Sequence, residues 1–381
     1  MTDPAIHTTL RVLSVQSDIL GHRTYCESMR RCFAGFEDVD LAACWYHEGR
    51  TFLDRVLYKL AHRRLPLLTD NRDYQRARAE WSVGRMGTRL ARKKLAAGQY
   101  DLLHFHTQVQ AFGAARLMRS IPAVIGCDMT AYQIARESTV RFPETHKPSI
   151  AMERAVFAAA AHIVTWSEWA RRSVIEEHGI GEDKVTAILP GARLETFAEP
   201  CFDSHEKPRI LFVGGDFARK GGQDLLDVFT HHLAGRAELH LVTGHPVACS
   251  APDVFVHRGI VAYRPEWHRL FRMADIFAMP SHAEAFGLVF QEAAGYGLAM
   301  VGTKINAIPE MVIEGENGFL VEPGGHAALQ DKLLLLVENR DLLERMRRRS
   351  REIALERFDA AKNFRALADL FRKVVERRRQ G

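Results

Sequence analysis

The sequence predicts an α/β protein with two domains, each built around a parallel sheet. Short apolar runs such as residues 209–213 and 276–279 have the length of buried strands, and segments of helical character separate them. A chain of 381 residues, 47% of them hydrophobic, exceeds the usual size of a single hydrophobic core. Residues 195–208 are polar, contain proline and lack a periodic apolar pattern, which is typical of a linker. We therefore expect one domain on each side of this linker.

The first domain is expected to alternate strands with helices in the manner of a Rossmann unit. The apolar runs predict strands at residues 10–15, 41–45, 101–106, 122–127 and 163–167. Helices are expected at residues 25–33, 152–161 and 168–178, and residues 52–97 form a long Arg-rich segment of helical character. The turn after the first strand contains Gly21 but no G-x-G-x-x-G, so a dinucleotide cofactor is not supported.

The second domain follows the same alternation. Strands are expected at residues 209–213, 239–243, 254–257 and 276–279, and helices at residues 223–231, 267–273, 287–295, 331–349 and 359–379. The first turn of this domain, VGGDFARKGG, carries Gly215, Arg219 and Lys220 between a strand and a helix. It is not a P-loop, because the sequence Gly-Lys-Ser/Thr is absent.

Two carboxylates lie on either side of the helix start that follows the strand at residues 276–279. Glu284 is expected on the loop and Glu292 inside the helix, since eight residues along one helix would leave the side chains roughly 80° apart. Ligands of open α/β sheets bind at such strand ends. The N–H groups at the helix start lack helical acceptors and favour a phosphate; they belong to Phe286, Gly287 and Leu288. An anion site with a carboxylate on each side suits a ligand with a phosphate in the middle and hydroxyl groups at each end, such as a sugar nucleotide.

The stretch E-AFGLVFQ-E, preceded by DIFAMPS and followed by GLAMVGT and IPEMV, resembles the E-x7-E signature of retaining glycosyltransferases of family 4. The run from AAAHIVTWSEWARRS to LPGARLETF is similar to the end of that family's first domain. The resemblance spans roughly residues 10–375 and implies the GT-B fold, in which two Rossmann-like domains face a cleft and a C-terminal helix crosses back to the first domain. The corresponding domains are residues 1–198, 206–355 and 356–381.

The same resemblance implies roles for individual residues. Glu284 would lie beside the donor sugar and Glu292 would hold the ribose hydroxyls. Lys220, with Arg219 beside it and Gly215 on the same turn, would bind the donor diphosphate. The backbone of Phe286, Gly287 and Leu288 would complete this diphosphate site. His106 would contact the donor sugar and Gly21 would lie near the phosphates. The expected catalytic residues are Glu284, His106 and Lys220.

The sequence departs from the family pattern at three places. Gly215 stands where the phosphate turn usually has an arginine, and GCDMT replaces a T-x-H-D/G pattern on the acceptor side. Near the linker, LPGAR replaces the usual Asn/Pro-Gly-Val-Asp. These changes affect the expected contacts with the acceptor and near the hinge.

The resemblance implies transfer of a sugar, with retention, from a nucleotide-sugar donor to a glycan, a lipid-linked acceptor or a small molecule. No metal and no cofactor are expected, because Lys220, Arg219 and the helix start would stabilise the leaving diphosphate. Alternatives are a nucleotide-sugar isomerase or epimerase on the same fold, a glycoside hydrolase using Glu284 and Glu292, and a carbohydrate-binding protein without activity. No nucleic-acid partner is expected.

The formal net charge of +5 is unevenly distributed. Residues 54–94 hold twelve Lys or Arg against four Asp or Glu, with Leu53, Leu57, Leu60 and Leu65 at helical spacing. Either this helix packs its apolar side on the core and exposes a basic face, or it binds an anionic membrane or acceptor. The chain shows neither a leader segment nor a spanning apolar run, so we expect a cytoplasmic protein, with peripheral binding to the inner membrane face as the alternative. The six cysteines include no C-x2-C pair, which indicates neither a zinc site nor a disulfide framework.

Overall fold

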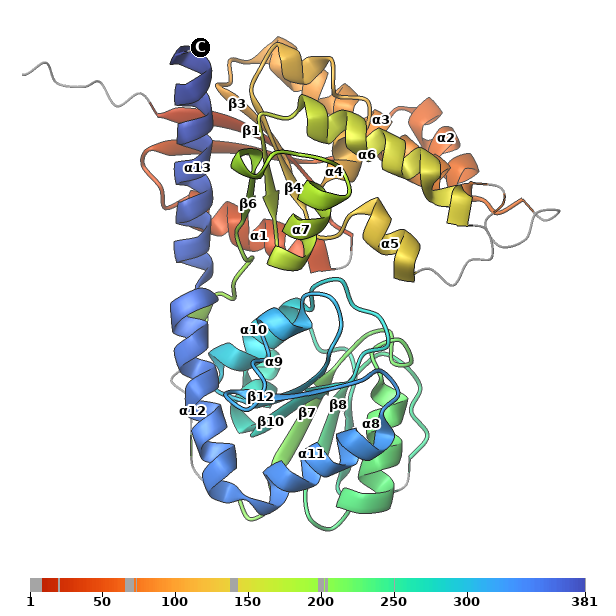
Figure 1. Cartoon of the computed structure of the whole chain (residues 1–381), viewed down its shortest axis with the longest axis vertical. Coiled ribbons are helices and arrows are strands. Elements are labelled where there is room, and N and C mark those ends of the chain that lie inside the picture. The colour runs from red at the N-terminus through yellow and green to blue at the C-terminus, as the bar shows by residue number, and fades with distance from the viewer. Residues whose placement is uncertain are drawn as a thin grey trace, which may run out of the picture. The chain divides into compact units, whose positions relative to one another are not determined.

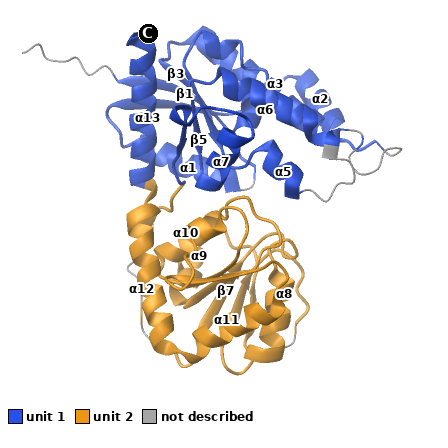
Figure 2. Cartoon of the chain, viewed as in Figure 1, with its two compact units in different colours: residues 1–189, 361–381 blue, residues 190–360 orange. Residues whose placement is uncertain are grey.

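The computed structural model describes residues 9–19, 21–65, 72, 74–137, 143–197, 202, 205–249 and 251–380. It divides into two compact units, unit 1 with residues 1–189 and 361–381 and unit 2 with residues 190–360 (Figure 2). The start of the expected linker belongs to unit 2, since Ala192 pairs with Asp359 and the side chains of Leu194 and Phe197 lie against Gly295. The remainder of that linker falls partly outside the described residues.

Unit 1 contains a six-stranded parallel sheet in the order β2-β1-β3-β4-β5-β6 (Figure 1). Its strands are β1 (Leu10–Gln16), β2 (Val39–Trp45), β3 (Leu102–Phe105), β4 (Ala123–Cys127), β5 (His162–Thr165) and β6 (Val185–Ala187). The strands expected from the apolar runs are present within one or two residues of their predicted bounds. Strand β6 was not anticipated, because it is only three residues long.

The helices of unit 1 are α1 (Gly21–Phe33), α2 (Phe52–His62), α3 (Gln75–Ala97), α4 (Gln108–Ala111), α5 (Ala131–Glu137), α6 (Lys147–Ala159) and α7 (Glu168–Glu176). Short 3₁₀ turns are η1 (Leu117–Arg119), η2 (Pro143–His146) and η3 (Glu182–Lys184). The single helical segment expected at residues 52–97 is two helices. Helix α2 is closed at its start by a capping box between Thr51 and Asp54, and it ends because Arg63 adopts an extended conformation.

The core-packed interpretation of the leucines in this segment is wrong for three of them. Leu53, Leu60 and Leu65 are exposed, and only Leu57 is half-buried. The side of α2 that faces the protein instead presents Asp54 and Ala61, both buried.

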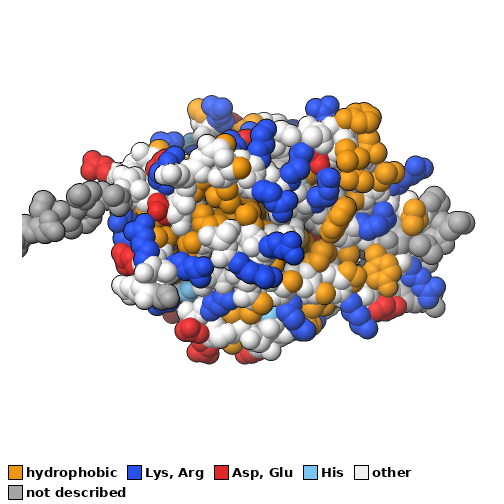
Figure 3. Space-filling model, turned by 90° about the horizontal axis from the view of Figure 1, so that it is seen from above, with side chains coloured by type: hydrophobic (Ala, Val, Ile, Leu, Met, Phe, Trp, Pro, Cys, Tyr) orange, Lys and Arg blue, Asp and Glu red, His pale blue; other side chains and the backbone are white. Residues whose placement is uncertain are grey.

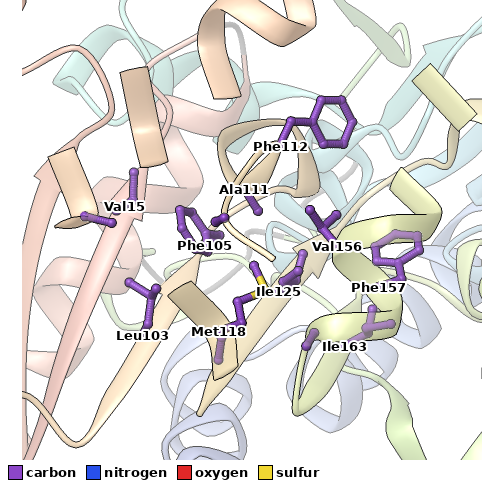
Figure 4. Close-up of a cluster of buried hydrophobic side chains, with 14 of the residues drawn as sticks. Val15, Leu103, Phe105, Ala111, Phe112, Met118, Ile125, Val156, Phe157 and Ile163 are labelled. Carbon is purple, nitrogen blue, oxygen red and sulfur yellow. The ribbon is translucent and has the colours of Figure 1, made fainter. Parts of the chain in front are cut away.

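The core of unit 1 lies between the sheet and the helices α3, α4 and α6. Leu103, Phe105 and Ile125 from β3 and β4 meet Phe112 and Phe157 from the covering layer (Figure 4). Each of these side chains is buried, as the near-continuous apolar runs of strands covered on both faces predict.

The last helix, α13 (Ala360–Gln380), covers unit 1, as the fold prediction requires. Its buried Phe364 and Phe371 pack against Phe33 at ring-centroid distances of 6.3 and 6.0 Å. Arg365 donates to both carboxylate oxygens of Asp38, at 2.8 and 3.1 Å. An apolar stripe and an ion pair therefore anchor the C-terminus.

Unit 2 contains a second six-stranded parallel sheet, in the order β12-β11-β10-β7-β8-β9. Its strands are β7 (Arg209–Val213), β8 (Glu238–Val242), β9 (Val254–His257), β10 (Ile276–Met279), β11 (Ala299–Thr303) and β12 (Gly318–Val321). The first strand of the unit, β7, lies between β8 and β10, so the strand order reverses there. Ligands of open α/β sheets bind at the carboxyl ends of strands at such a switch point.

The helices of unit 2 are α8 (Gly222–Val228), α9 (Pro265–Met273), α10 (Leu288–Gly295), α11 (His326–Glu338) and α12 (Arg340–Arg357). A π-helical turn η5 (Phe229–Leu233) and the 3₁₀ turns η4 (Leu194–Thr196) and η6 (Ile308–Glu310) complete it. The helix expected at residues 331–349 is two helices, because Asn339 is extended and its side chain accepts from the backbone N–H of Leu342 at 3.0 Å. None of the described helices has the length and apolar character of a membrane-spanning segment.

Candidate functional site

The turns that follow β7 and β10 are in backbone contact at the switch point of unit 2. A Cβ atom on Gly221 would lie 1.9 Å from the carbonyl oxygen of Pro280, and Gly221 has a φ of +71°. The N–H of His282 donates to the carbonyl of Arg219 at 2.8 Å. Only glycine satisfies both the close approach and the left-handed conformation at position 221.

This contact places two cations beside Glu284. Nζ of Lys220 lies 3.2 Å and Nη1 of Arg219 lies 3.7 Å from Oε2 of the carboxylate. Arg219 also donates to Asp216 at 3.1 Å and to the carbonyl of Ala283 at 2.6 Å, so its guanidinium is largely used inside the protein. The described surroundings of Lys220 offer its ammonium only Glu284 and, at 3.7 Å, the sulfur of Met279. Lys220 is therefore the better placed of the two cations for an incoming anion.

The loop that carries Glu284 is held from the next strand. Oγ1 of Thr303 donates to the carbonyl of Ser281 at 2.8 Å, and the side-chain amide of Asn306 donates to the carbonyl of Glu284 at 2.9 Å. Helix α10 then begins after Gly287, whose φ of +83° directs the chain into the helix. As predicted from the spacing, Glu284 lies on the loop and Glu292 within the helix. The predicted phosphate-binding backbone of Phe286, Gly287 and Leu288 spans the start of α10.

Glu292 is only 5% exposed and is surrounded by groups that sequence inspection did not identify. Burial raises the pKa of its carboxyl to about 7, while a hydrogen bond with Tyr263 and the charges of Arg193 and Lys220 oppose that rise. The guanidinium of Arg193 lies over the ring of Tyr263, 3.4 Å from its centroid. These neighbours give the carboxylate a defined position and partial ionisation near neutral pH.

Arg193 and Tyr263 are the site residues that the sequence analysis missed. The departure LPGAR contained a signal for Arg193, since an arginine stands where the family has an aspartate, but its partner could not be identified. Tyr263 adopts a φ of +60°, which is rare for an aromatic residue and costs of order 1 kcal/mol. Such a conformation depends on tertiary contacts and has no sequence signature.

In unit 1, His106 follows β3 and is buried under aromatic rings. Its Nε2 lies 2.9 Å from Nδ1 of His22, and its ring lies 4.8 and 5.6 Å from those of Tyr25 and Trp166. Burial, followed by the charges of His22 and His104, holds the pKa of His106 well below its usual value, so the ring is neutral. Its predicted contact with the donor sugar stays a prediction.

The other histidine of this strand, His104, has a structural environment. Its Nδ1 lies 2.9 Å from Oγ of Ser14, and burial lowers its pKa to about 3. His106, which follows this strand, instead contacts His22 and Tyr25 of α1.

The two remaining glycines take different positions. Gly21 is the first residue of α1, so the helix starts earlier than predicted. Gly215 is exposed, and a Cβ atom there would have no neighbour within 4 Å. The structure brings Lys220, Arg219, Glu284, Gly287 and Glu292 together in unit 2, and it places Gly21 and His106 in unit 1. Across the described residues no group of three or more His, Cys, Asp or Glu is suited to hold a metal.

Sequence models for two families match this chain. The model described as Glycosyl transferases group 1 matches residues 253–353, which contain the loop after β10 and both glutamates, and Glycosyltransferase Family 4 matches residues 38–196. The chain belongs to the group 1 glycosyltransferases of family 4. The family predicted from the stretch E-AFGLVFQ-E is confirmed.

A curated relative of this glycosyltransferase is D-inositol 3-phosphate glycosyltransferase from Xylanimonas cellulosilytica. It is 27% identical over 314 residues, which cover 74% of each chain. Alignments with further enzymes of the same name cover 61% to 66% of those proteins. The relationship is therefore distant and in most cases spans less than two thirds of the relative.

Solved structures establish the GT-B fold. Sucrose-phosphate synthase from Thermosynechococcus elongatus superimposes with a TM-score of 0.73 at 16% identity, over 96% of this glycosyltransferase and 99% of that chain. HepE from Anabaena, crystallised with UDP-glucose, gives a TM-score of 0.65 at 17% identity, over 96% and 100% of the two chains. At these identities the likeness concerns the fold.

Replacing Gly221 by alanine is expected to destabilise the protein by about 3 kcal/mol or more, because the new methyl group would overlap Pro280 and the left-handed conformation would be strained. Gly215→Ala, on the same turn, is the matched control and should change the free energy of unfolding by less than about 0.5 kcal/mol. Thermal or urea unfolding measures both. Equal stability of the two variants would contradict the backbone contact.

Glu292→Gln is expected to stabilise the protein at pH 8. The carboxyl has an ordinary pKa of 4.5 and a pKa of about 7 in the folded state, so the folded protein loses stability as pH rises between these values. Removing the charge should recover about 3 kcal/mol at pH 8, and this gain should shrink as pH falls toward about 4.5. Melting temperatures across this range test it, with the exposed Asp331→Asn as a control. A loss of stability at pH 8 would show that the buried carboxylate is net stabilising.

Proposed function

We propose that this glycosyltransferase moves a sugar from a nucleoside diphosphate sugar to a hydroxyl acceptor, with retention of anomeric configuration and without a metal ion. The observation that carries the proposal is the ion pair of Lys220 with Glu284 at the switch point of the unit 2 sheet, beside the start of α10. A cation, a carboxylate and the N-terminal end of a helix at one point match a diphosphate joined to a sugar.

The donor diphosphate is assigned to Lys220 and to the backbone at Phe286, Gly287 and Leu288. Arg219 is assigned a supporting role, since Asp216 and Ala283 already use its guanidinium. The carboxylate of Glu284, held by Lys220, then accepts hydrogen bonds from hydroxyl groups of the transferred sugar. When the donor binds, the ammonium of Lys220 would interact with the diphosphate as well as with Glu284, so its ion pair with Glu284 would weaken.

Glu292 is assigned to the ribose. A carboxylate accepts hydrogen bonds from two neighbouring hydroxyl groups at once, and α10 presents Glu292 on the same helix whose start is assigned to the phosphates. Tyr263 and Arg193 are positioning residues for this carboxylate. Burial raises the pKa of Glu292 to about 7 because it removes water from the carboxylate. Hydrogen bonds donated by the ribose hydroxyls would replace that water and stabilise the ionised form.

The proposed reaction breaks the bond between the anomeric carbon and the diphosphate oxygen. Negative charge grows on that oxygen, where Lys220 and the helix start stabilise it more strongly than in the ground state. The acceptor oxygen forms its bond to the same face of the anomeric carbon, and its proton passes to the departing diphosphate. These protein groups supply the charge stabilisation that a divalent cation would otherwise provide.

The crystal structure of HepE with UDP-glucose supports a uridine donor as the first probe, and ADP-glucose and GDP-mannose are natural comparators. The proposed acceptor is a hydroxyl group of a glycan, a lipid-linked sugar or a small molecule. His106 and Gly21 of unit 1 are kept as proposed donor contacts.

The structural surroundings of the two glutamates favour transfer over glycoside hydrolysis. In hydrolysis they would act as a pair, one as acid and one as nucleophile or base. Here Glu284 is paired with Lys220 and Arg219, whereas Glu292 is enclosed by Tyr263 and Arg193. Although the charge of Lys220 acts on both carboxylates, each has direct partners of its own, which favours separate roles over an acid–nucleophile pair.

Lys220→Ala and Glu292→Gln are expected to impair the enzyme in different ways. Loss of the ammonium at the leaving group should lower kcat about a hundredfold or more, equivalent to about 3 kcal/mol. Glu292→Gln weakens a contact present before and during the reaction, so it should chiefly raise the KM for the donor. Steady-state kinetics with varied donor and a saturating acceptor separate the two effects.

Lys332→Ala provides the matched control, since this lysine pairs with Glu314 elsewhere in unit 2, at 3.7 Å, and should leave both constants unchanged. Normal turnover by Lys220→Ala would rule out the diphosphate assignment. Unchanged donor KM in Glu292→Gln would remove the ribose assignment while leaving transfer itself intact.

A further inference from the structure

Helix α2 turns its apolar side toward solvent. At about 100° per residue, Phe52, Val56, Leu60 and Leu53 fall within an arc of about 100°, whereas the buried Asp54 lies on the opposite side. Phe52 is 83%, Leu53 55% and Leu60 54% exposed. An amphipathic helix that served only the core of unit 1 would have the reverse orientation.

Basic side chains border this arc. Arg55 and Lys59 lie along one edge of it, and Arg63 and Arg64 follow the end of the helix; all four are exposed. No ion-pair partner for any of them occurs among the described residues. The one acidic residue between positions 49 and 65 is Asp54, whose side chain is fully buried. The exposed side of α2 is thus apolar and cationic, with no exposed carboxylate of its own.

Arginines of α3 bind α2 and are not part of its exposed basic edge. Arg85 and Arg89 both pair with the buried Asp54, and Arg78 donates to the carbonyls of Leu60 and Arg63 at 3.0 Å each. These arginines fix α2 onto unit 1 and hold it with the apolar arc outward. The excess positive charge at residues 54–94 therefore divides into arginines that fasten α2 and cations that α2 presents.

Exposed apolar side chains are concentrated in and after α2 along the chain. Of the eleven large hydrophobic residues exposed in the described chain, six lie between positions 52 and 81: Phe52, Leu53, Leu60, Leu65, Tyr74 and Trp81. A groove of about 890 Å³ is lined by residues of α2 and of the segment before it, among them Arg50, Phe52, Val56 and Lys59. Figure 3 shows hydrophobic and Lys or Arg side chains side by side over the visible face, with Asp and Glu mainly near its edges.

We propose that α2 is a docking helix that binds an anionic lipid bilayer, with Phe52, Leu53, Val56 and Leu60 inserted among the acyl chains near the headgroups. Arg55, Lys59, Arg63 and Arg64 then meet lipid phosphates, and the groove beside Arg50 accepts a headgroup. Apolar insertion and phosphate attraction act together in interfacial helices of this kind. A second copy of the chain is a poorer occupant, since it would bring a cationic surface against a cationic surface.

Sedimentation with vesicles tests the proposal without reference to catalysis. The protein should bind vesicles of 30% phosphatidylglycerol in phosphatidylcholine and bind pure phosphatidylcholine far more weakly, with the difference reduced by salt. Phe52→Ser should lower the partition coefficient about tenfold. The double variant Arg55→Glu and Lys59→Glu should lower it about twenty-fivefold or more, at about fivefold for each positive charge removed.

Matched controls lie away from α2. Leu335→Ser alters an exposed apolar residue of α11, and Lys373→Glu alters an exposed lysine of α13. Both variants should bind vesicles as the unaltered protein does. Melting temperatures of all variants should stay close to that of the unaltered protein, because the altered side chains are exposed.

Several results would overturn the docking proposal. These are equal binding to neutral and anionic vesicles, full binding by the α2 variants, or an equal loss in the controls. Binding of a soluble anionic polysaccharide that is lost in the α2 variants, without vesicle binding, would assign the surface to a glycan instead. None of these outcomes bears on donor binding in unit 2, so the two proposals fail independently.

Discussion

The contact between the backbones of Gly221 and Pro280 is the constraint on which the geometry of the candidate site depends. It joins the turns after β7 and β10 at the switch point of the sheet, so that Lys220 from one turn and Glu284 from the other lie 3.2 Å apart. From there the chain enters α10 through Gly287, and α10 carries Glu292 into its buried position. This one backbone contact thus fixes the relative positions of Lys220, the start of α10 and the two glutamates.

The sequence predicted the parts of this site that depend on strand ends and helix starts. Buried parallel strands have continuous apolar runs, so β7, β9 and β10 could be placed at their observed bounds, and the positions of Glu284 and Glu292 followed from spacing. Arg193 and Tyr263 could not be predicted, because their meeting with Glu292 depends on tertiary packing and, for Tyr263, on an unusual backbone conformation. The division of residues 331–349 into two helices depends on the side-chain cap of Asn339, which a periodic pattern does not reveal.

The basic segment illustrates a different limit of sequence analysis. A helical pattern of leucines with interspersed arginines is compatible with either face turned inward, because periodicity gives the angle between two faces and not which of them is buried. In α2 the choice depends on Asp54, whose burial is made possible by Arg85 and Arg89 from α3. A buried ion-pair cluster thereby leaves an apolar arc exposed, at a cost in stability that a binding role would explain.

We propose that unit 2 binds a nucleoside diphosphate sugar through an ionised Glu292. Calorimetric titration of UDP-glucose between pH 6 and pH 8 tests this binding most directly. Since the pKa of Glu292 is about 7, affinity should rise about tenfold over this range, and Glu292→Gln should remove the dependence. Affinity that is independent of pH, or that rises equally in Glu292→Gln, would contradict the claim.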